Sequence, residues 1–250
     1  MNEIKGPSIE VIQRARHEFG GAIRETPSWQ WLGHRVAKLA PADATLWLKL
    51  ELFQHTGSFK PRGAVLTLRS LSAEQLARGC VAVSAGNHGM AVAYAARQVG
   101  TKVLVAMPAS ANPARVQACR DLGGEVELLP DIASAFGRAE ALQAEQGLTF
   151  LHPFEGERTV LGTATLGLEF LRQVGQLDAV FVAIGGGGLA AGVACAVKQL
   201  QPRCKVIGVE PTGADSMHQS FAAGSPQRIA AVRTIADSLG APMAMPYTYG

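Results

Sequence analysis

The sequence from residue 179 to residue 197 reads AVFVAIGGGGLAAGVACAV and carries no charged side chain. Its first part, Ala179–Ile184, is rich in residues that favour strands, and the part after the glycines is rich in helix formers. Four glycines in the middle would badly weaken a lipid-exposed helix, so we reject a membrane span. The stretch instead predicts a buried strand, a glycine turn and a buried helix of an α/β fold.

Strand and helix patterns alternate in the same way from Gly79 onward. The expected strands are Cys80–Ser84, Lys102–Met107, Glu125–Leu129, Leu148–His152, Ala179–Ile184 and Lys205–Glu210. The expected helices are His88–Val99, Pro113–Leu122, Ile132–Gln146, Val160–Gln173 and Leu189–Leu200, preceded by a helix at Ile9–Phe19 and a strand at Thr45–Glu51. Such alternation predicts parallel sheets with right-handed crossovers, in which ligands bind at the carboxyl ends of the strands. The loops after Ser84 and after Ile184 are therefore candidate ligand sites.

The composition is typical of a compact enzyme. The 250 residues can bury a large core, and 48% of them are hydrophobic against 17% charged. A net charge of +3 with scattered basic residues gives no sign of a nucleic-acid partner. The four cysteines are widely spaced and form no metal-binding pair, and the N-terminus lacks the apolar run of a signal peptide. We therefore expect a protein of the reducing cytoplasm.

The first candidate site is the glycine run Gly185, Gly186, Gly187 and Gly188, between an expected strand and an expected helix. Backbone N–H groups at such a helix start can surround a phosphate, because glycine permits close approach and the helix dipole favours negative charge. The segment also fits the dinucleotide pattern as Gly186-x-Gly188-x-x-Ala191, and Glu210 closes the next expected strand at a plausible distance for a ribose. A phosphate site is predicted, and an NAD-binding protein stays open as an alternative.

The second candidate is Lys60, in the segment GSFKPRG of residues 57–63. A lysine between an aromatic residue and a proline, with glycines on both sides, is not a typical solvated surface lysine. If Lys60 is partly desolvated, the pKa of its amine falls and the neutral form can attack a carbonyl carbon. The alternative is an ordinary lysine at a helix start, with Ser58 as its cap.

The third candidate is the loop SAGNHG of residues 84–89, which follows an expected strand and precedes an expected helix. A hydroxyl, an amide and a helix N-terminus together suit a carboxylate, and the Asn87 side chain can hydrogen-bond a ring hydroxyl. The alternative is simple capping, with Ser84 or Asn87 at the N-cap and His88 as a packed neighbour. The dinucleotide interpretation leaves this loop and the lysine segment without a role.

In this order the three segments resemble the fold type II pyridoxal-phosphate enzymes, and the threonine/serine dehydratase (serine racemase-like) branch in particular. Further shared motifs are Lys49-Leu50-Glu51, His152-Pro153-Phe154 and Thr234-Ile235-Ala236-Asp237. The resemblance extends over nearly the whole chain. It implies a two-lobed α/β architecture of the tryptophan synthase β type, built on parallel sheets. The larger, cofactor-binding lobe would comprise residues 1–71 and 151–250, and the smaller lobe residues 72–150.

The resemblance implies pyridoxal 5′-phosphate as the cofactor and gives each segment a role. Lys60 would form the Schiff base, and Phe59 would pack beside the cofactor ring. Asn87 would bond the ring hydroxyl, and the glycines Gly185–Gly188 would hold the phosphate.

The activity implied is that of an ammonia-lyase, which converts L-threonine or L-serine to a 2-oxo acid and ammonia. The substrate amine would displace Lys60, whose freed amine would then act as the base at Cα. Ser84, Asn87 and His88 would receive the substrate carboxylate. Ala85 stands where racemases of this family carry a serine for proton transfer, so dehydration is expected rather than racemisation. A homodimer is a further expectation.

The sequence departs from the family pattern in two places. A Mg²⁺ or Ca²⁺ site is implied at Glu210 and the Ala214 carbonyl, but Ser216 stands where an acidic ligand is usual. The chain stops at Gly250, whereas family members continue for several more elements, so the C-terminal part of the fold is expected to be missing. The chain is then either a fragment or a truncated, non-catalytic remnant that keeps the fold.

Overall fold

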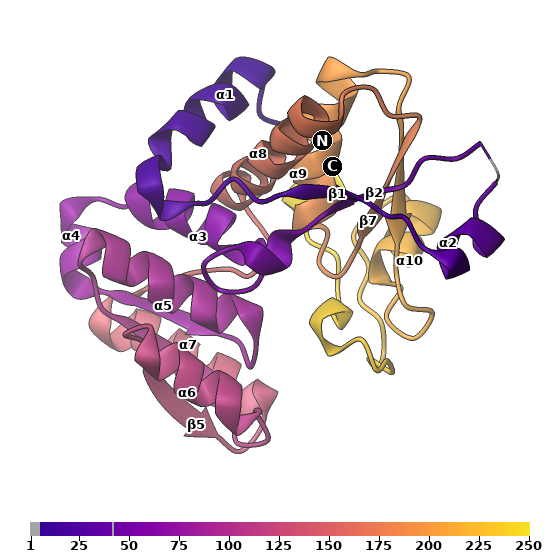
Figure 1. Ribbon diagram of the computed structural model, residues 1–250. Coiled ribbons are helices and arrows are strands. Elements are labelled where there is room, and N and C mark those ends of the chain that lie inside the picture. The colour runs from indigo at the N-terminus through magenta and orange to yellow at the C-terminus, as the bar shows by residue number, and fades with distance from the viewer. Residues whose placement is uncertain (1–5, 42) are drawn as a thin grey trace.

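The computed structural model describes residues 6–41 and 43–250, which form helices packed around three small sheets (Figure 1). The strands are β1 (Ser28–Gln30), β2 (Trp47–Lys49), β3 (Cys80–Val83), β4 (Val103–Pro108), β5 (Glu125–Leu129), β6 (Thr149–Phe150), β7 (Ala179–Ala183) and β8 (Lys205–Val209). The longer helices are α1 (Ile9–Glu18), α3 (Lys60–Arg69), α5 (Asn87–Val99), α6 (Pro113–Asp121), α7 (Ile132–Gln146), α8 (Glu157–Val174), α9 (Gly188–Leu200) and α10 (Ser216–Ala223). Shorter helical segments are η1 (Gly20–Ala22), α2 (His34–Leu39), η2 (Glu51–Phe53), α4 (Ala73–Arg78), η3 (Asp237–Leu239) and α11 (Pro246–Tyr249).

The largest sheet has the strand order β5-β4-β3-β6, and all neighbouring strands in it are parallel. Successive residues of a strand point to opposite faces of a sheet. Cys80 and Ala82 of β3 accordingly pack with α5, whereas Val81 and Val83 pack with α7. Figure 1 shows α5 and α6 in front of this sheet and α7 behind it. Cover on both faces explains why the central strands β3 and β4 read as continuous apolar runs in the sequence.

The second parallel sheet consists of β7 and β8, with Ala179 opposite Lys205 in the register. Val180 and Val182 of β7 pack into a core with residues of α8 and α9. The opposite face of this sheet carries the exposed side chains of Phe181, Ile207 and Val209. A separate antiparallel pair is formed by β1 and β2.

The helices α3, α8 and α9 connect the two parallel sheets. α3 packs against α5 on one side and α8 on the other, and α8 packs along α9 (Figure 1). Glycines permit the close crossings: a Cβ on Gly162 would lie 2.5 Å from the carbonyl oxygen of Arg62, and one on Gly192 would lie 2.5 Å from that of Val160. The first contact fixes the start of α3 against α8, and the second holds α9 against α8.

We predict that Gly162→Ala lowers the free energy of unfolding by about 1–3 kcal/mol, because a methyl group at this crossing overpacks two backbones. Gly137→Ala on α7 is the matched control, since nothing lies within 4 Å of the added Cβ. The control is expected to be neutral or up to about 1 kcal/mol more stable, because alanine favours helix. Denaturant unfolding of both variants measures the difference, and equal stabilities would contradict the close crossing.

The structure confirms the α/β class and the parallel sheets expected from the sequence. Every strand and helix expected after Gly79 forms, with ends that differ by a few residues. The expected strand Thr45–Glu51 shortens to β2, because its last residues turn into η2. α3, α4 and α10 were not assigned from the sequence. No helix in the described ranges is long and apolar enough to cross a membrane. The lobe boundaries at residues 72 and 150 stay a prediction.

Candidate active site

Lys60 is the first residue of α3, with Phe59 at the N-cap and Pro61 in the first turn. Proline is well suited to this position, because the first N–H groups of a helix have no partner inside it. No side chain caps the helix, and the Ser58 hydroxyl is buried without a hydrogen-bond partner. Lys60 therefore does start a helix, but the interpretation of Ser58 as its cap is wrong.

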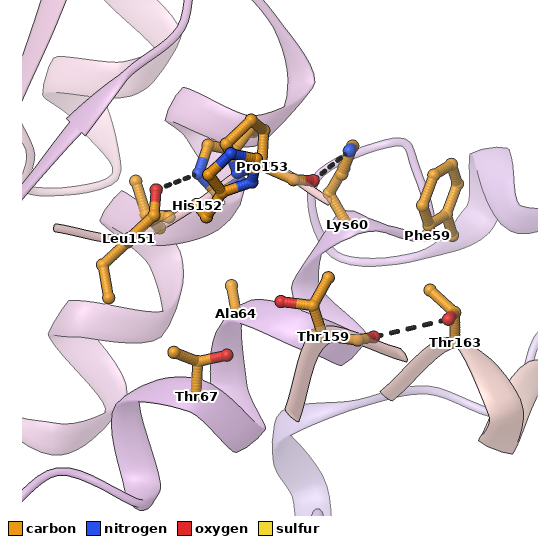
Figure 2. A pocket seen from close by; sticks show the side chains of 12 residues that line it. Phe59, Lys60, Ala64, Thr67, Leu151, His152, Pro153, Thr159 and Thr163 are labelled. Carbon is orange, nitrogen blue, oxygen red and sulfur yellow. Dashed lines mark hydrogen bonds between the residues drawn. The ribbon is translucent and has the colours of Figure 1, made fainter. Parts of the chain in front are cut away.

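The Lys60 amine is turned inward. Its Nζ donates a hydrogen bond to the Pro153 carbonyl at 2.5 Å and lies 5.2 Å from the centre of the Phe59 ring (Figure 2). Burial lowers the pKa of the amine from 10.5 to about 8. About a tenth of the amine is then neutral and nucleophilic at pH 7, far more than for a lysine with the ordinary pKa of 10.5.

A small pocket surrounds this amine. Its lining residues include Phe59, Lys60, His88, His152 and Thr163. Figure 2 shows Lys60 between Phe59 and His152. His88 Nε2 donates to the Leu151 carbonyl at 2.9 Å, and burial together with the nearby Lys60 charge lowers the His88 pKa to about 3. The His88 side chain is thus neutral and anchored to the Leu151 carbonyl.

His152 is neutral as well. Burial and the charge of Lys60 lower its pKa to about 4. Its Nδ1 accepts hydrogen bonds from the backbone N–H groups of Phe154 and Glu155, at 3.3 and 2.9 Å. This imidazole shapes the chain around Pro153 and so places the carbonyl that binds Lys60.

The loop of residues 84–89 forms the N-terminus of α5. Its N-cap is Gly86, without a side-chain cap, and the Ser84 hydroxyl accepts a hydrogen bond from the Gly86 N–H at 3.1 Å. The interpretation of Ser84 or Asn87 as the N-cap is therefore wrong. Asn87 is the first residue of α5 and is half-buried. Neither Ser84 nor Asn87 lines the Lys60 pocket.

The glycine run forms the N-terminus of α9, which begins at Gly188 after Gly187 with φ of +90°. A Cβ on Gly186 would lie 2.2 Å from the Phe154 ring, and one on Gly188 would lie 2.5 Å from the Phe154 carbonyl oxygen. Among the described residues, the N–H groups of Gly185 to Gly188 have no hydrogen-bond acceptor. Free amides, absent side chains and a helix N-terminus together fit a phosphate group.

The glycine run connects to the Lys60 pocket through two residues that the sequence analysis did not assign. Thr163 lines the pocket and donates to the Gly188 carbonyl at 2.6 Å. Phe154 packs on Gly186 and edge-to-face against His152, with ring centres 4.6 Å apart. Phe154 belongs to the His-Pro-Phe motif, which was a signal for it, whereas nothing in the sequence pointed to Thr163.

The Glu210 carboxylate binds two backbone N–H groups at the start of α10. Its two carboxylate oxygens accept from the N–H groups of Met217 and His218 at 3.0 and 2.8 Å, which anchors the start of α10. These two hydrogen bonds give Glu210 a structural role at the start of α10. The described residues contain no group of three or more His, Cys, Asp or Glu side chains placed for a metal. Ala214 is fully buried, and the cation site at Glu210 and Ala214 stays a prediction.

We predict that the Lys60 amine reacts with a small acylating reagent at a rate that is half-maximal near pH 8. The direction follows from burial, which disfavours the charged form, so the neutral amine appears as pH rises through about 8 and not through 10.5. Competitive labelling followed by peptide mass spectrometry measures the profile. A midpoint at the ordinary lysine value would contradict the enclosed position of the amine.

Three comparisons relate this geometry to known proteins. A family model described as "Pyridoxal-phosphate dependent enzyme" matches residues 21–249. The chain is 54% identical over 244 residues to a phenylserine dehydratase of Ralstonia pickettii, with 97% of this chain and 73% of that protein covered. It is 39% identical over 233 residues to an L-threonine ammonia-lyase of Thermotoga maritima, with 93% of this chain and 57% of that protein covered.

Solved structures of related enzymes have the same fold as this chain. A maize serine racemase superposes with a TM-score of 0.90 at 33% identity, covering 98% of this chain and 73% of the racemase chain. The processed form of threonine deaminase isoform 2 from Solanum lycopersicum superposes with a TM-score of 0.87 at 32% identity, covering 99% of this chain and 73% of that chain. The chain thus spans about three quarters of the length of these structures.

The comparisons confirm the fold class, the pyridoxal-phosphate cofactor and the dehydratase class of activity predicted from the three segments. They give no support to the dinucleotide alternative. The chain therefore belongs to the family of pyridoxal-phosphate dependent enzymes, in its threonine/serine dehydratase branch.

Proposed function

We propose that this chain forms the site of an ammonia-lyase that converts a β-hydroxy amino acid to a 2-oxo acid and ammonia. L-threonine and L-serine are the proposed substrates, and phenylserine joins them because a phenylserine dehydratase is 54% identical. The observation that carries the proposal is the Lys60 amine, enclosed at the start of α3 with its pKa lowered to about 8. Such an amine can hold a carbonyl cofactor and then exchange it for a substrate amine.

The cofactor phosphate would be held by the N–H groups of Gly185 to Gly188 at the start of α9, which are free of other acceptors in the described chain. Phe59 would pack beside the cofactor ring, and Asn87 would bond its hydroxyl group. Bound pyridoxal phosphate supplies an electron sink for negative charge at Cα, which amino-acid side chains cannot provide.

The substrate carboxylate would bind at the N-terminus of α5, where the loop carries Ser84, Asn87 and His88. The helix dipole and the first N–H groups favour an anion there. Because the His88 imidazole is neutral and bonded to Leu151, His88 would contribute through its backbone. The carboxylate is then oriented without a full positive charge from this histidine.

Proton removal at Cα would fall to Lys60, whose amine is largely neutral above about pH 8 and partly neutral below it. Ala85, in the loop before α5, has no group that can transfer a proton. A single base on one face favours loss of the β-hydroxyl over inversion at Cα. Dehydration is therefore the proposed outcome for this chain.

The test is an absorption spectrum of the purified chain with pyridoxal phosphate, before and after addition of L-threonine, L-serine or phenylserine. A band from the Lys60-bound cofactor that changes with substrate, together with a 2-oxo acid product, is expected. A stable band without product would favour the non-catalytic alternative, and no band would refute the proposal.

Two further expectations concern the oligomeric state and the location of the protein. A homodimer is proposed from the general frequency of two-fold symmetric assemblies. A cytoplasmic location is proposed because Cys80, Cys119, Cys195 and Cys204 are all free thiols. Sedimentation of the purified chain and fractionation of the producing cells test these two points.

A further inference from the structure

Four charged side chains form a buried network around the first turn of α3. They are Lys49 of β2, Glu51 of η2, Arg62 of α3 and Glu169 of α8, and each exposes 11% or less of its side-chain surface. Lys49 and Glu51 belong to a motif shared with the family, yet neither lines the Lys60 pocket. The function proposed above gives them no role.

Arg62 is the centre of this network and is completely buried. Its Nε and Nη2 donate to the two carboxylate oxygens of Glu51, both at 2.8 Å. Its Nη1 and Nη2 donate to Glu169 at 3.1 and 3.0 Å, and Nη1 also donates to the Thr165 hydroxyl at 3.3 Å. All the donors of the guanidinium group are thus engaged, in a planar geometry that lysine cannot reproduce. Burial opposes the charge, but the hydrogen bonds and charges of Glu51 and Glu169 raise the pKa of Arg62.

Lys49 is the second cation of the network and shares Glu169 with Arg62. Its Nζ donates to Glu169 at 2.6 Å, to the Thr26 carbonyl at 2.5 Å and to Gln173 at 2.9 Å. Two cations and two carboxylates then balance, so no net charge is buried. Such networks seldom add stability over apolar packing, because every charge must leave water. Their distinctive contribution is a fixed geometry.

That geometry acts on the residue two positions before Arg62. Lys60 and Arg62 share the first turn of α3, and the α8 backbone at Gly162 lies directly on the backbone of Arg62. The Pro153 carbonyl that accepts from Lys60 lies on the segment that leads into α8. A shift of α3 against α8 would therefore move the amine relative to its partner.

We propose that Arg62 is a positioning residue for Lys60: its guanidinium group, held by Glu51 and Glu169, fixes the first turn of α3 so that the amine points into the pocket. Arg62 touches neither the pocket nor the proposed ligands and acts only through Lys60. This inference rests on the proposed role of Lys60 as the reacting amine.

The test compares Arg62→Lys with Arg138→Lys, the same change at the half-exposed ion pair that Arg138 forms with Glu127. Two quantities are measured: the pH profile of Lys60 acylation in the cofactor-free chain, and the rate at which added pyridoxal phosphate becomes linked to Lys60. In Arg62→Lys the profile is expected to move by at least one pH unit from its midpoint near 8, and the linkage is expected to slow at least tenfold. Arg138→Lys is expected to match the unmodified chain in both.

A purely structural role would lower the thermal stability of Arg62→Lys but leave both Lys60 readouts unchanged, and that result would overturn the proposal. If Arg62→Lys does not fold, the charge-balanced pair Lys49→Met with Glu169→Gln takes its place, because it removes half of the Arg62 clamp without stranding a charge. The pair is expected to slow the linkage severalfold, and an unchanged rate would again overturn the proposal. Failure of the unmodified chain to link the cofactor would refute the proposed function instead, and the acylation profiles would still test the positioning.

Discussion

Lys60→Ala is expected to remove both the absorption band of the bound cofactor and the formation of 2-oxo acid, with a loss of activity of at least about 10³-fold. The reason is that Lys60 is the one lysine among the residues that line the described pocket. The neutral imidazoles of His88 and His152 remain there, and neither can bond the cofactor carbonyl carbon as an amine does. Absorption spectroscopy and a 2-oxo acid assay measure the two effects.

Lys60→Arg provides the sharper control for this prediction. Arginine keeps the positive charge and similar length, but its guanidinium group stays protonated and cannot attack a carbonyl. Loss of the band in both variants, together with an unchanged spectrum for the exposed Lys102→Ala, would assign the band to Lys60. A band of full strength in Lys60→Ala would contradict the site.

Gly188→Ala is expected to weaken binding of pyridoxal phosphate by about tenfold to 100-fold. The added Cβ would lie 2.5 Å from the Phe154 carbonyl oxygen, and relief of such overpacking costs about 1–3 kcal/mol. Because Gly188 begins α9, the movement displaces the N–H groups that are proposed to hold the phosphate. Titration of the chain with pyridoxal phosphate, followed by absorption, measures the affinity.

Two other glycines make this prediction specific. Gly185→Ala brings its Cβ 3.2 Å from Leu239 Cα, a tight contact but not an overlap, so a smaller loss is expected. Gly137→Ala has open space around its Cβ and is expected to bind the cofactor as the unmodified chain does. If Gly188→Ala binds as tightly as Gly137→Ala, the phosphate does not sit at the start of α9.

Much of the fold was predictable from local patterns. The apolar runs that became β3 and β4 needed no knowledge of distant residues, because a parallel strand covered on both faces must be apolar throughout. The helix that follows the glycine run was also predictable from local sequence, because the glycines mark the residue at which it begins. α3 was raised from the sequence only as the alternative interpretation of Lys60 at a helix start. Its sequence, KPRGAVLTLR, contains a proline and a glycine, which have low helix propensity.

The candidate site also has parts that local sequence predicts and parts that depend on tertiary contacts. The sequence by itself was enough to predict Lys60, the loop before α5 and the glycine run as site residues, because their chemistry lies in contiguous residues and their order along the chain is distinctive. Only the tertiary structure decided what surrounds them: the Pro153 carbonyl on the lysine amine, Thr163 on the glycine run, and Glu169 on Arg62. These partners are separated by between 25 and 107 residues, and no local pattern specifies which distant carbonyl or carboxylate will meet a given side chain. Which groups come into contact depends on how closely α3, α8 and α9 pack. That packing depends on glycines that let two helix backbones approach, and the approach is visible only in the tertiary structure.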